Sequence, residues 1–82
     1  MKTTGYFNYT RSRPDRAQIR DEWIRQAIDD PLREQIQSDG RVRRWTFVSG
    51  ENKYLRVVLL EDRETVHNAF FDRGFTDRSG TP

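Results

Sequence analysis

The strongest periodic pattern in the chain is an apolar stripe over residues 12–29. Its apolar members recur three and four positions apart, as they do on one side of an α-helix: Ala17, Ile19, Trp23, Ile24, Ala27 and Ile28. Ser12 supplies a capping hydroxyl, Pro14 suits a first helical turn and Asp15 places an acid there. Pro31 disfavours helical geometry at the residue before it. The pattern therefore predicts one amphipathic helix across this range.

Shorter segments on both sides of this stripe are typical of β-strands. Residues 5–10 are aromatic and β-prone, and they predict a first strand. Residues 32–37 alternate and predict a short edge strand, which the Ser-Asp-Gly turn at 38–40 would close. Longer strands are predicted further along, joined by the turns at 50–53 and 62–63: residues 41–49, 54–61 and 64–73.

Together these elements predict an α+β domain in the order β-α-β-β-β-β. One amphipathic helix would pack on a four- to five-stranded antiparallel sheet. We expect a single domain over residues 1–82, with an ordered core over 5–75 and a flexible tail over 76–82. No internal repeat or linker indicates a second domain.

Alternation along the strands divides the sheet residues into two faces, because successive side chains of a strand point in opposite directions. With turns of even length, the face toward the helix carries Val42, Arg44, Thr46, Val48, Leu55, Val57, Leu59, Val66, Asn68 and Phe70. The face away from the helix, called the second face below, carries Arg43, Trp45, Phe47, Tyr54, Arg56, Val58, Leu60, His67, Ala69, Phe71 and Arg73.

The second face is too apolar for a sheet surface that is left in water. We therefore expect something to cover it, and three occupants are open. These are the chain's own first strand and tail, another copy of the chain, or a substrate.

Composition favours a small folded domain with a thin core. The 82 residues are 33% hydrophobic and 34% charged, but the aromatic content of 12% argues against disorder. The chain has no cysteine and one histidine, which excludes disulfides and a histidine-cysteine metal site as sources of stability. We expect no metal and no cofactor, and we expect a homo-oligomer, either a dimer or a tetramer, as the compensation.

The charge pattern is more informative than the net charge, which is only +2. Thirteen of the fifteen basic residues are arginine, whose planar guanidinium suits carboxylates, phosphates and aromatic rings. Many of them sit beside acids, as on an ordinary solvated surface. No apolar run is long enough for a membrane span or a signal peptide. We expect a cytoplasmic protein without a membrane partner.

His67 and Arg56 are the candidates for catalysis. His67 is the side chain that titrates near neutrality, and a neighbouring arginine could hold a phosphate while the imidazole moves a proton, as RNA cleavage requires. Each also has a structural alternative. The histidine could be half-buried and bonded to a backbone or acidic group, and the arginine could pair with Asp72, Glu61 or an acid of a second subunit.

Ligand or interface contacts are expected from the other second-face residues: Arg43, Trp45, Phe47, Tyr54, Phe71 and Arg73. Interleaved arginines and aromatics suit stacked bases or phosphate-bearing ligands, and aromatics equally suit the core of a protein interface. The basic run at 41–44 could line a groove. The sequence has no glycine-rich phosphate loop, zinc-ligand spacing or nucleophile elbow.

Asp-Pro-Leu at 30–32, followed by the strand at 54–60 and a final strand that ends at 72–73, resembles small bacterial ribonuclease toxins of the RelE and BrnT type. The segment 65–73 also resembles a set of small uncharacterised bacterial proteins. The resemblance implies a helix on an antiparallel sheet, a basic concave face that cleaves RNA, and an antitoxin that blocks this face. Arg56, His67 and Arg73 would match basic residues of the family. The chain lacks the Lys-His-Gly stretch of BrnT-like helices.

The leading hypothesis is a small oligomeric bacterial accessory or mobile-element protein, whose basic and aromatic second face binds a partner or a small anionic ligand. The alternative is an endoribonuclease toxin of a toxin-antitoxin pair, with RNA as substrate. A third hypothesis is an antitoxin-like regulatory binder.

Overall fold

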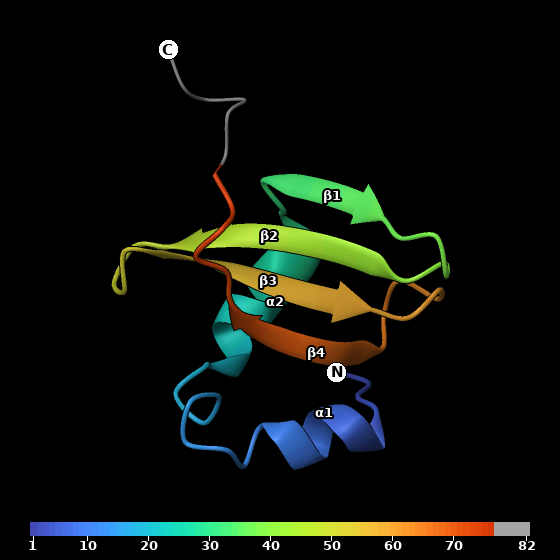
Figure 1. Cartoon of the computed structure of the whole chain (residues 1–82), viewed down its shortest axis with the longest axis horizontal. Helices are drawn as coiled ribbons and strands as arrows, with labels where there is room; N and C mark the ends of the chain where they lie inside the picture. Colours follow the sequence, from blue (N-terminus) through green and yellow to red (C-terminus); the bar gives the residue numbers. More distant parts are fainter. Residues whose placement is uncertain (77–82) are drawn as a thin grey trace.

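The computed structural model describes residues 1–76, in which two helices flank a four-stranded antiparallel sheet (Figure 1). Neighbouring strands follow the order of the chain, β1-β2-β3-β4. This confirms the α+β class and the antiparallel sheet. The elements are α1 (Gly5–Thr10), α2 (Asp21–Asp29), β1 (Arg33–Ile36), β2 (Val42–Val48), β3 (Lys53–Leu59) and β4 (Val66–Phe71).

The face of the sheet toward α2 holds the hydrophobic core. Ile24 and Ala27 of α2 are buried there, and Trp23 and Ile28 pack around them, so the part of the apolar stripe from Trp23 to Ile28 lies where its spacing predicted. The buried sheet residues of this core are Val42, Val48, Leu55, Val57, Leu59, Val66 and Ala69. No helix within residues 1–76 is long and apolar enough to cross a membrane.

Residues 5–10 form helix α1, so the prediction of a first strand was wrong. The Oγ1 of Thr4 accepts a hydrogen bond from the N–H of Phe7 at 3.1 Å and caps the helix. Phe7 and Thr10 lie three positions apart and are both buried, so one helical side packs against the domain. This burial outweighs the β-propensity of the segment, and the sheet has four strands, the smaller of the two numbers predicted.

α2 begins at Asp21, later than the apolar stripe suggested. The hydroxyl of Ser12 donates to the carbonyl of Tyr9 at 2.7 Å, so it closes the end of α1 instead of capping a second helix. Residues 11–18 form turns, and Arg20 has extended geometry immediately before the helix. The helix ends at Asp29, just before Pro31, as predicted.

A β-bulge at His67 inverts the faces of the last strand. Val58 lies opposite Asn68 whereas Leu59 lies opposite Val66, which leaves one extra residue on β4. The predicted parity holds for β2 and β3, but it fails after the bulge. Ala69 and Phe71 consequently join the core, and Asn68 and Phe70 take their places on the second face.

The ends of the described chain lie on different parts of the sheet (Figure 1). Residues 2–4 run along the outer edge of β4, where Thr3 and Val66 form an isolated parallel bridge. After β4 the chain turns back across the second face toward β1 (Figure 1). The flexible tail predicted at 76–82 lies, apart from Thr76, outside the described residues.

Candidate functional site

The second face has two halves, which differ in what covers them. We call the part around Arg33, Trp45, Phe47 and Tyr54 the aromatic half, and the part around Gln35, Gln37, Arg41, Arg43 and Val58 the arginine half. The returning chain after β4 lies over the aromatic half (Figure 1). Because β2 contributes Trp45 to one half and Arg43 to the other, the two halves adjoin.

Phe75 covers the aromatic half. Its ring is stacked on the indole of Trp45, with centroids 4.7 Å apart and an interplanar angle of 13°. It also meets the ring of Tyr54 edge-on at 5.0 Å, and the guanidinium of Arg33 lies 5.9 Å from its centroid. Trp45 is only 4% exposed as a result. Of the three occupants expected for the second face, the chain's own C-terminal segment therefore covers this half.

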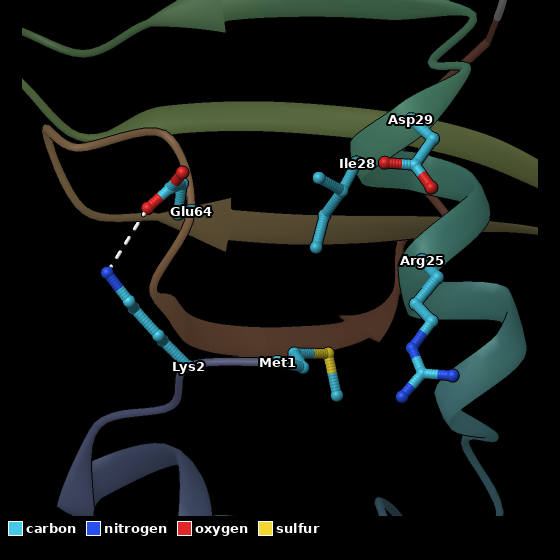
Figure 2. Close-up of a pocket in the computed structure, with 6 residues that line it drawn as sticks. All are labelled: Met1, Lys2, Arg25, Ile28, Asp29 and Glu64. Carbon is cyan, nitrogen blue, oxygen red and sulfur yellow. Dashed lines mark hydrogen bonds and ion pairs between the residues drawn. The ribbon is translucent and has the colours of Figure 1, made fainter.

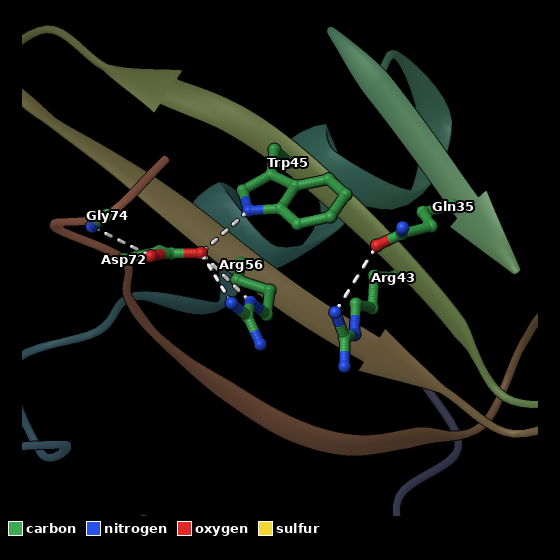
Figure 3. Close-up of polar contacts among 6 residues, drawn as sticks. All are labelled: Gln35, Arg43, Trp45, Arg56, Asp72 and Gly74. Carbon is green, nitrogen blue, oxygen red and sulfur yellow. Dashed lines mark hydrogen bonds and ion pairs between the residues drawn. The ribbon is translucent and has the colours of Figure 1, made fainter. Parts of the chain in front are cut away.

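Asp72 connects the returning chain to the sheet (Figure 3). Its Oδ2 accepts hydrogen bonds from Trp45 Nε1 at 3.0 Å and from Arg56 Nε and Nη2 at 3.0 and 2.7 Å. Its Oδ1 accepts one from the N–H of Gly74 at 3.0 Å. Arg56 also lies over the ring of Phe70, 4.9 Å from its centroid. The ion pair with Asp72, one of the alternatives expected for Arg56, is therefore present.

The pKa of Asp72 reflects this network. Burial raises it, but the hydrogen bonds from Trp45 and Arg56, the positive charge of Arg56 and the N–H of Gly74 outweigh burial and leave the pKa below its usual value. Asp72 is therefore ionised at neutral pH, and the charge of Arg56 is compensated.

Arg43 lies in the arginine half and is held by neutral groups (Figure 3). Its Nη1 donates to Gln35 Oε1 at 3.2 Å. The Gln37 side chain is satisfied when its oxygen faces Arg43, and it then accepts from Nη2 at 2.6 Å and from Nε at 2.9 Å. Three of the five guanidinium N–H groups are thus used, which leaves two. No carboxylate within residues 1–76 forms an ion pair with Arg43, so its charge is positioned but uncompensated by a partner.

His67 sits on the bulge and contacts the N-terminal segment. Its ring stacks on Tyr6 with centroids 4.9 Å apart, and its Nδ1 lies 3.1 Å from Thr4 Oγ1. Burial, and then the positive charge of Arg41, lower its pKa below 6.5. The imidazole is consequently neutral at pH 7.

The sheet does not bring Arg56 and His67 into contact. Arg56 pairs across the strands with Phe70, which is three positions from His67 along β4. At about 3.3 Å per residue this corresponds to roughly 10 Å of strand. The arginine whose positive charge lowers the pKa of His67 is Arg41, not Arg56.

Three other predicted site residues lie in three different parts of the domain. Phe71 is on the helix side, where its ring meets Trp23 at 6.0 Å, and its assignment to the second face was wrong because of the bulge. Arg73 is exposed in the turn after β4. Phe47 meets Tyr54 edge-on at 5.1 Å and stays in the aromatic half.

Four residues that shape the second face were not predicted from the sequence: Gln35, Gln37, Asp72 as an anchor of the indole, and Phe75 as its cover. The two glutamines had a signal, because their alternation in the predicted edge strand places them on the same side. Phe75 had a weaker one, as an isolated aromatic residue in a polar tail.

A hollow of about 340 Å³ opens on the other side of the sheet, between the N-terminal segment and α2 (Figure 2). It is lined by Met1, Lys2, Arg25, Ile28, Asp29 and Glu64. Lys2 pairs with Glu64 at 3.3 Å, and both side chains are largely exposed. Two basic and two acidic residues give the hollow no preferred sign of ligand charge. It is a weaker candidate than the arginine half.

Comparison with protein-family models, with curated proteins and with solved structures found no match to this chain. Residues 1–76 contain no group of three or more histidine, cysteine, aspartate or glutamate side chains that could hold a metal ion. The candidate site is therefore defined by its geometry and charge.

Proposed function

We propose that the chain is a binding module for a phosphate-bearing ligand, which it recognises through the arginine half of the second face. The observation that carries the proposal is Arg43. Two glutamine oxygens orient its guanidinium, and no carboxylate among residues 1–76 compensates it. A guanidinium held in this way loses little side-chain entropy when an anion binds, and its free N–H groups match phosphate oxygens.

The surroundings of Arg43 support an anionic ligand with some apolar surface. Val58 lies directly opposite Arg43 on β3 and Asn68 follows on β4, so the floor beside the guanidinium is apolar and then neutral. Arg16 flanks this floor, with its Nη1 2.6 Å from Asn68 Oδ1. Arg16 pairs with Asp15 at 3.6 Å and Arg41 pairs with Asp39 at 3.8 Å. Arg43 is therefore the arginine of this surface that has no carboxylate partner among residues 1–76.

The size of the basic region favours a short or single-stranded ligand over a duplex. The net charge is +2, and many other arginines have acidic partners. Binding of a duplex usually requires many phosphate contacts. A single-stranded ligand needs fewer when aromatic side chains lie beside the basic groups, as they do in the adjoining aromatic half.

RNA cleavage remains the alternative, and the geometry changes which residues it would need. Arg56 is engaged by Asp72 and lies about three strand positions from His67. A cleaving site would therefore have to combine His67, as a neutral imidazole, with Arg41 or Arg43. Self-association, an antitoxin partner, a mobile-element origin and a cytoplasmic location stay predictions.

The proposal is tested with a fluorescently labelled eight-nucleotide single-stranded RNA, whose anisotropy reports binding at low salt. Arg43→Gln should weaken binding by roughly 10- to 150-fold, because a charge-assisted hydrogen bond contributes roughly 1.5–3 kcal/mol. Arg25→Gln is the matched control, since it removes the same charge from α2 on the opposite side of the sheet, and it should change the affinity little.

Equal effects of the two substitutions would refute a specific role for Arg43. The same samples, run on a denaturing gel, address the alternative. Cleavage of the RNA that His67→Ala abolishes would establish the chain as a ribonuclease, and intact RNA would exclude this activity under those conditions.

A further inference from the structure

We propose that the slot filled by Phe75 is a stacking site for a nucleotide base, and that the C-terminal segment competes with the ligand for this slot. The inference rests on the proposed function, because it extends the phosphate site at Arg43 into the aromatic half. It names the ligand class as a nucleotide, alone or within a single strand of RNA.

The slot contacts Phe75 in the ways that proteins use to hold an unpaired base. The indole of Trp45 lies flat against the ring, Tyr54 meets it edge-on, and the guanidinium of Arg33 lies over it. Base recognition commonly combines stacking on an aromatic side chain with stacking on arginine. The slot is therefore suited to a planar π-system, which Phe75 supplies from within the chain.

The hydrogen bonds that attach the segment are strong at Asp72 and weak at Phe75, whose other contacts within residues 1–76 are made by its ring alone. Asp72 makes three hydrogen bonds to Trp45 and Arg56 and a fourth to Gly74. The backbone N–H of Phe75, by contrast, reaches the carbonyl of Asp72 at 3.4 Å, which is long for a hydrogen bond. Phe75 can thus leave the slot while the ion pair below it stays intact.

The slot and the phosphate site have the spacing that one ligand requires. Trp45 and Arg43 are two residues apart on the same face of β2, which separates them by about 7 Å. A hollow of about 390 Å³ adjoins Phe75 and reaches Gln35, the residue that orients Arg43. Glu34 also lines this hollow, but its carboxylate pairs with Arg44 at 2.7 Å. A nucleotide whose base replaces Phe75 would direct its phosphate along the hollow toward Arg43.

The test measures quenching of Trp45 fluorescence by adenosine monophosphate and by adenosine. A Trp23→Phe background leaves Trp45 as the only tryptophan, since the chain contains two. Phe75→Ala should raise the apparent affinity for adenosine monophosphate about tenfold, because apparent affinity scales with the fraction of molecules whose slot is open. Tyr9→Ala is the control. It removes an exposed aromatic ring from α1 and should leave the affinity unchanged.

Phe75→Leu is a second variant, which tests the inference even if Phe75→Ala does not fold. It keeps an apolar side chain over Trp45 but removes the planar ring, so the affinity should rise by roughly threefold, in keeping with the loss of an aromatic pair. Affinities of folded Phe75→Ala or Phe75→Leu proteins that equal the parent's would overturn the inference and show that Phe75 is a structural cover only.

Adenosine separates this inference from the proposed function, because it lacks a phosphate. If Phe75→Ala strengthens adenosine binding while Arg43→Gln leaves binding of the monophosphate unchanged, the stacking slot stands and the phosphate site fails. If Arg43→Gln weakens RNA binding and neither Phe75 variant changes any affinity, the phosphate site stands and the slot fails.

Discussion

Arg43 and Arg56 project from the same face of neighbouring strands, yet their surroundings differ. Arg56 in the aromatic half meets the carboxylate of Asp72, whereas Arg43 in the arginine half meets the amide oxygens of Gln35 and Gln37. The first arrangement neutralises a charge and the second only positions one. Identical residue types on one face thus serve stability in one half and are available for ligand binding in the other.

The difference follows from what covers each half. Phe75 removes water from the aromatic half, and a charge that loses water is costly unless a counter-charge replaces it. The side chains of Arg56 and Asp72 are only 24% and 11% exposed, respectively. In the arginine half Arg43 is partly exposed, so hydration and the glutamine oxygens stabilise its charge without an acid among residues 1–76.

The largest expected effect is on the aromatic half. Asp72→Ala would leave Arg56 and the indole N–H of Trp45 without their acceptor in a half-buried position. The free energy of unfolding should fall by about 2–3 kcal/mol, the cost of losing hydrogen bonds to a charged group. Urea denaturation measures it. Glu51→Ala, in the exposed turn between β2 and β3, should change it by less than about 0.5 kcal/mol, and equal losses in both variants would contradict the comparison.

An effect of intermediate size is expected in acid. The folded pKa of Asp72 lies below its usual 3.8, so its ionisation stabilises the fold fully above that value, and this contribution is lost as the pH falls through the folded pKa. The stability gap between the parent and Asp72→Asn should therefore be constant near neutrality and shrink below pH 3.8. A gap that persists unchanged in strong acid would show that the carboxylate charge is not its source.

The smallest effect is expected at His67, beside the arginine half. Because its folded pKa is lowered below 6.5, the unfolded chain binds a proton more readily, so the contribution of His67 to stability is largest above pH 6.5 and is lost as the pH falls from 6.5 to the folded pKa. Between pH 7 and the folded pKa, the parent should lose more stability than His67→Gln does. Parallel pH profiles of the two proteins would argue against this linkage.

Local signals were sufficient for part of the fold. The spacing of Ile24 and Ala27 placed the apolar side of α2, and the even loop between β2 and β3 placed Trp45, Arg43 and Arg56 on one face. These features depend on periodicity and on short-range turns, which the order of residues records directly.

Local signals failed where packing at longer range decides. The β-prone residues around Phe7 are helical because one side of the helix is buried, and the bulge at His67 reverses the faces of Asn68 and all later residues of β4. A single inserted residue inverts every side chain after it, and alternation alone cannot indicate where such an insertion occurs.

The second face shows both kinds of feature, those that local patterns predict and those that long-range packing decides. Strand alternation and apolar content are local properties, so they predicted a face rich in arginine and aromatic residues and led us to expect a cover over it. Alternation could not predict that Phe75 and Asp72 return to one half, nor that Arg43 in the other half has no acidic partner among residues 1–76. That outcome depends on contacts between residues distant in sequence, and these form only when the chain packs as a whole.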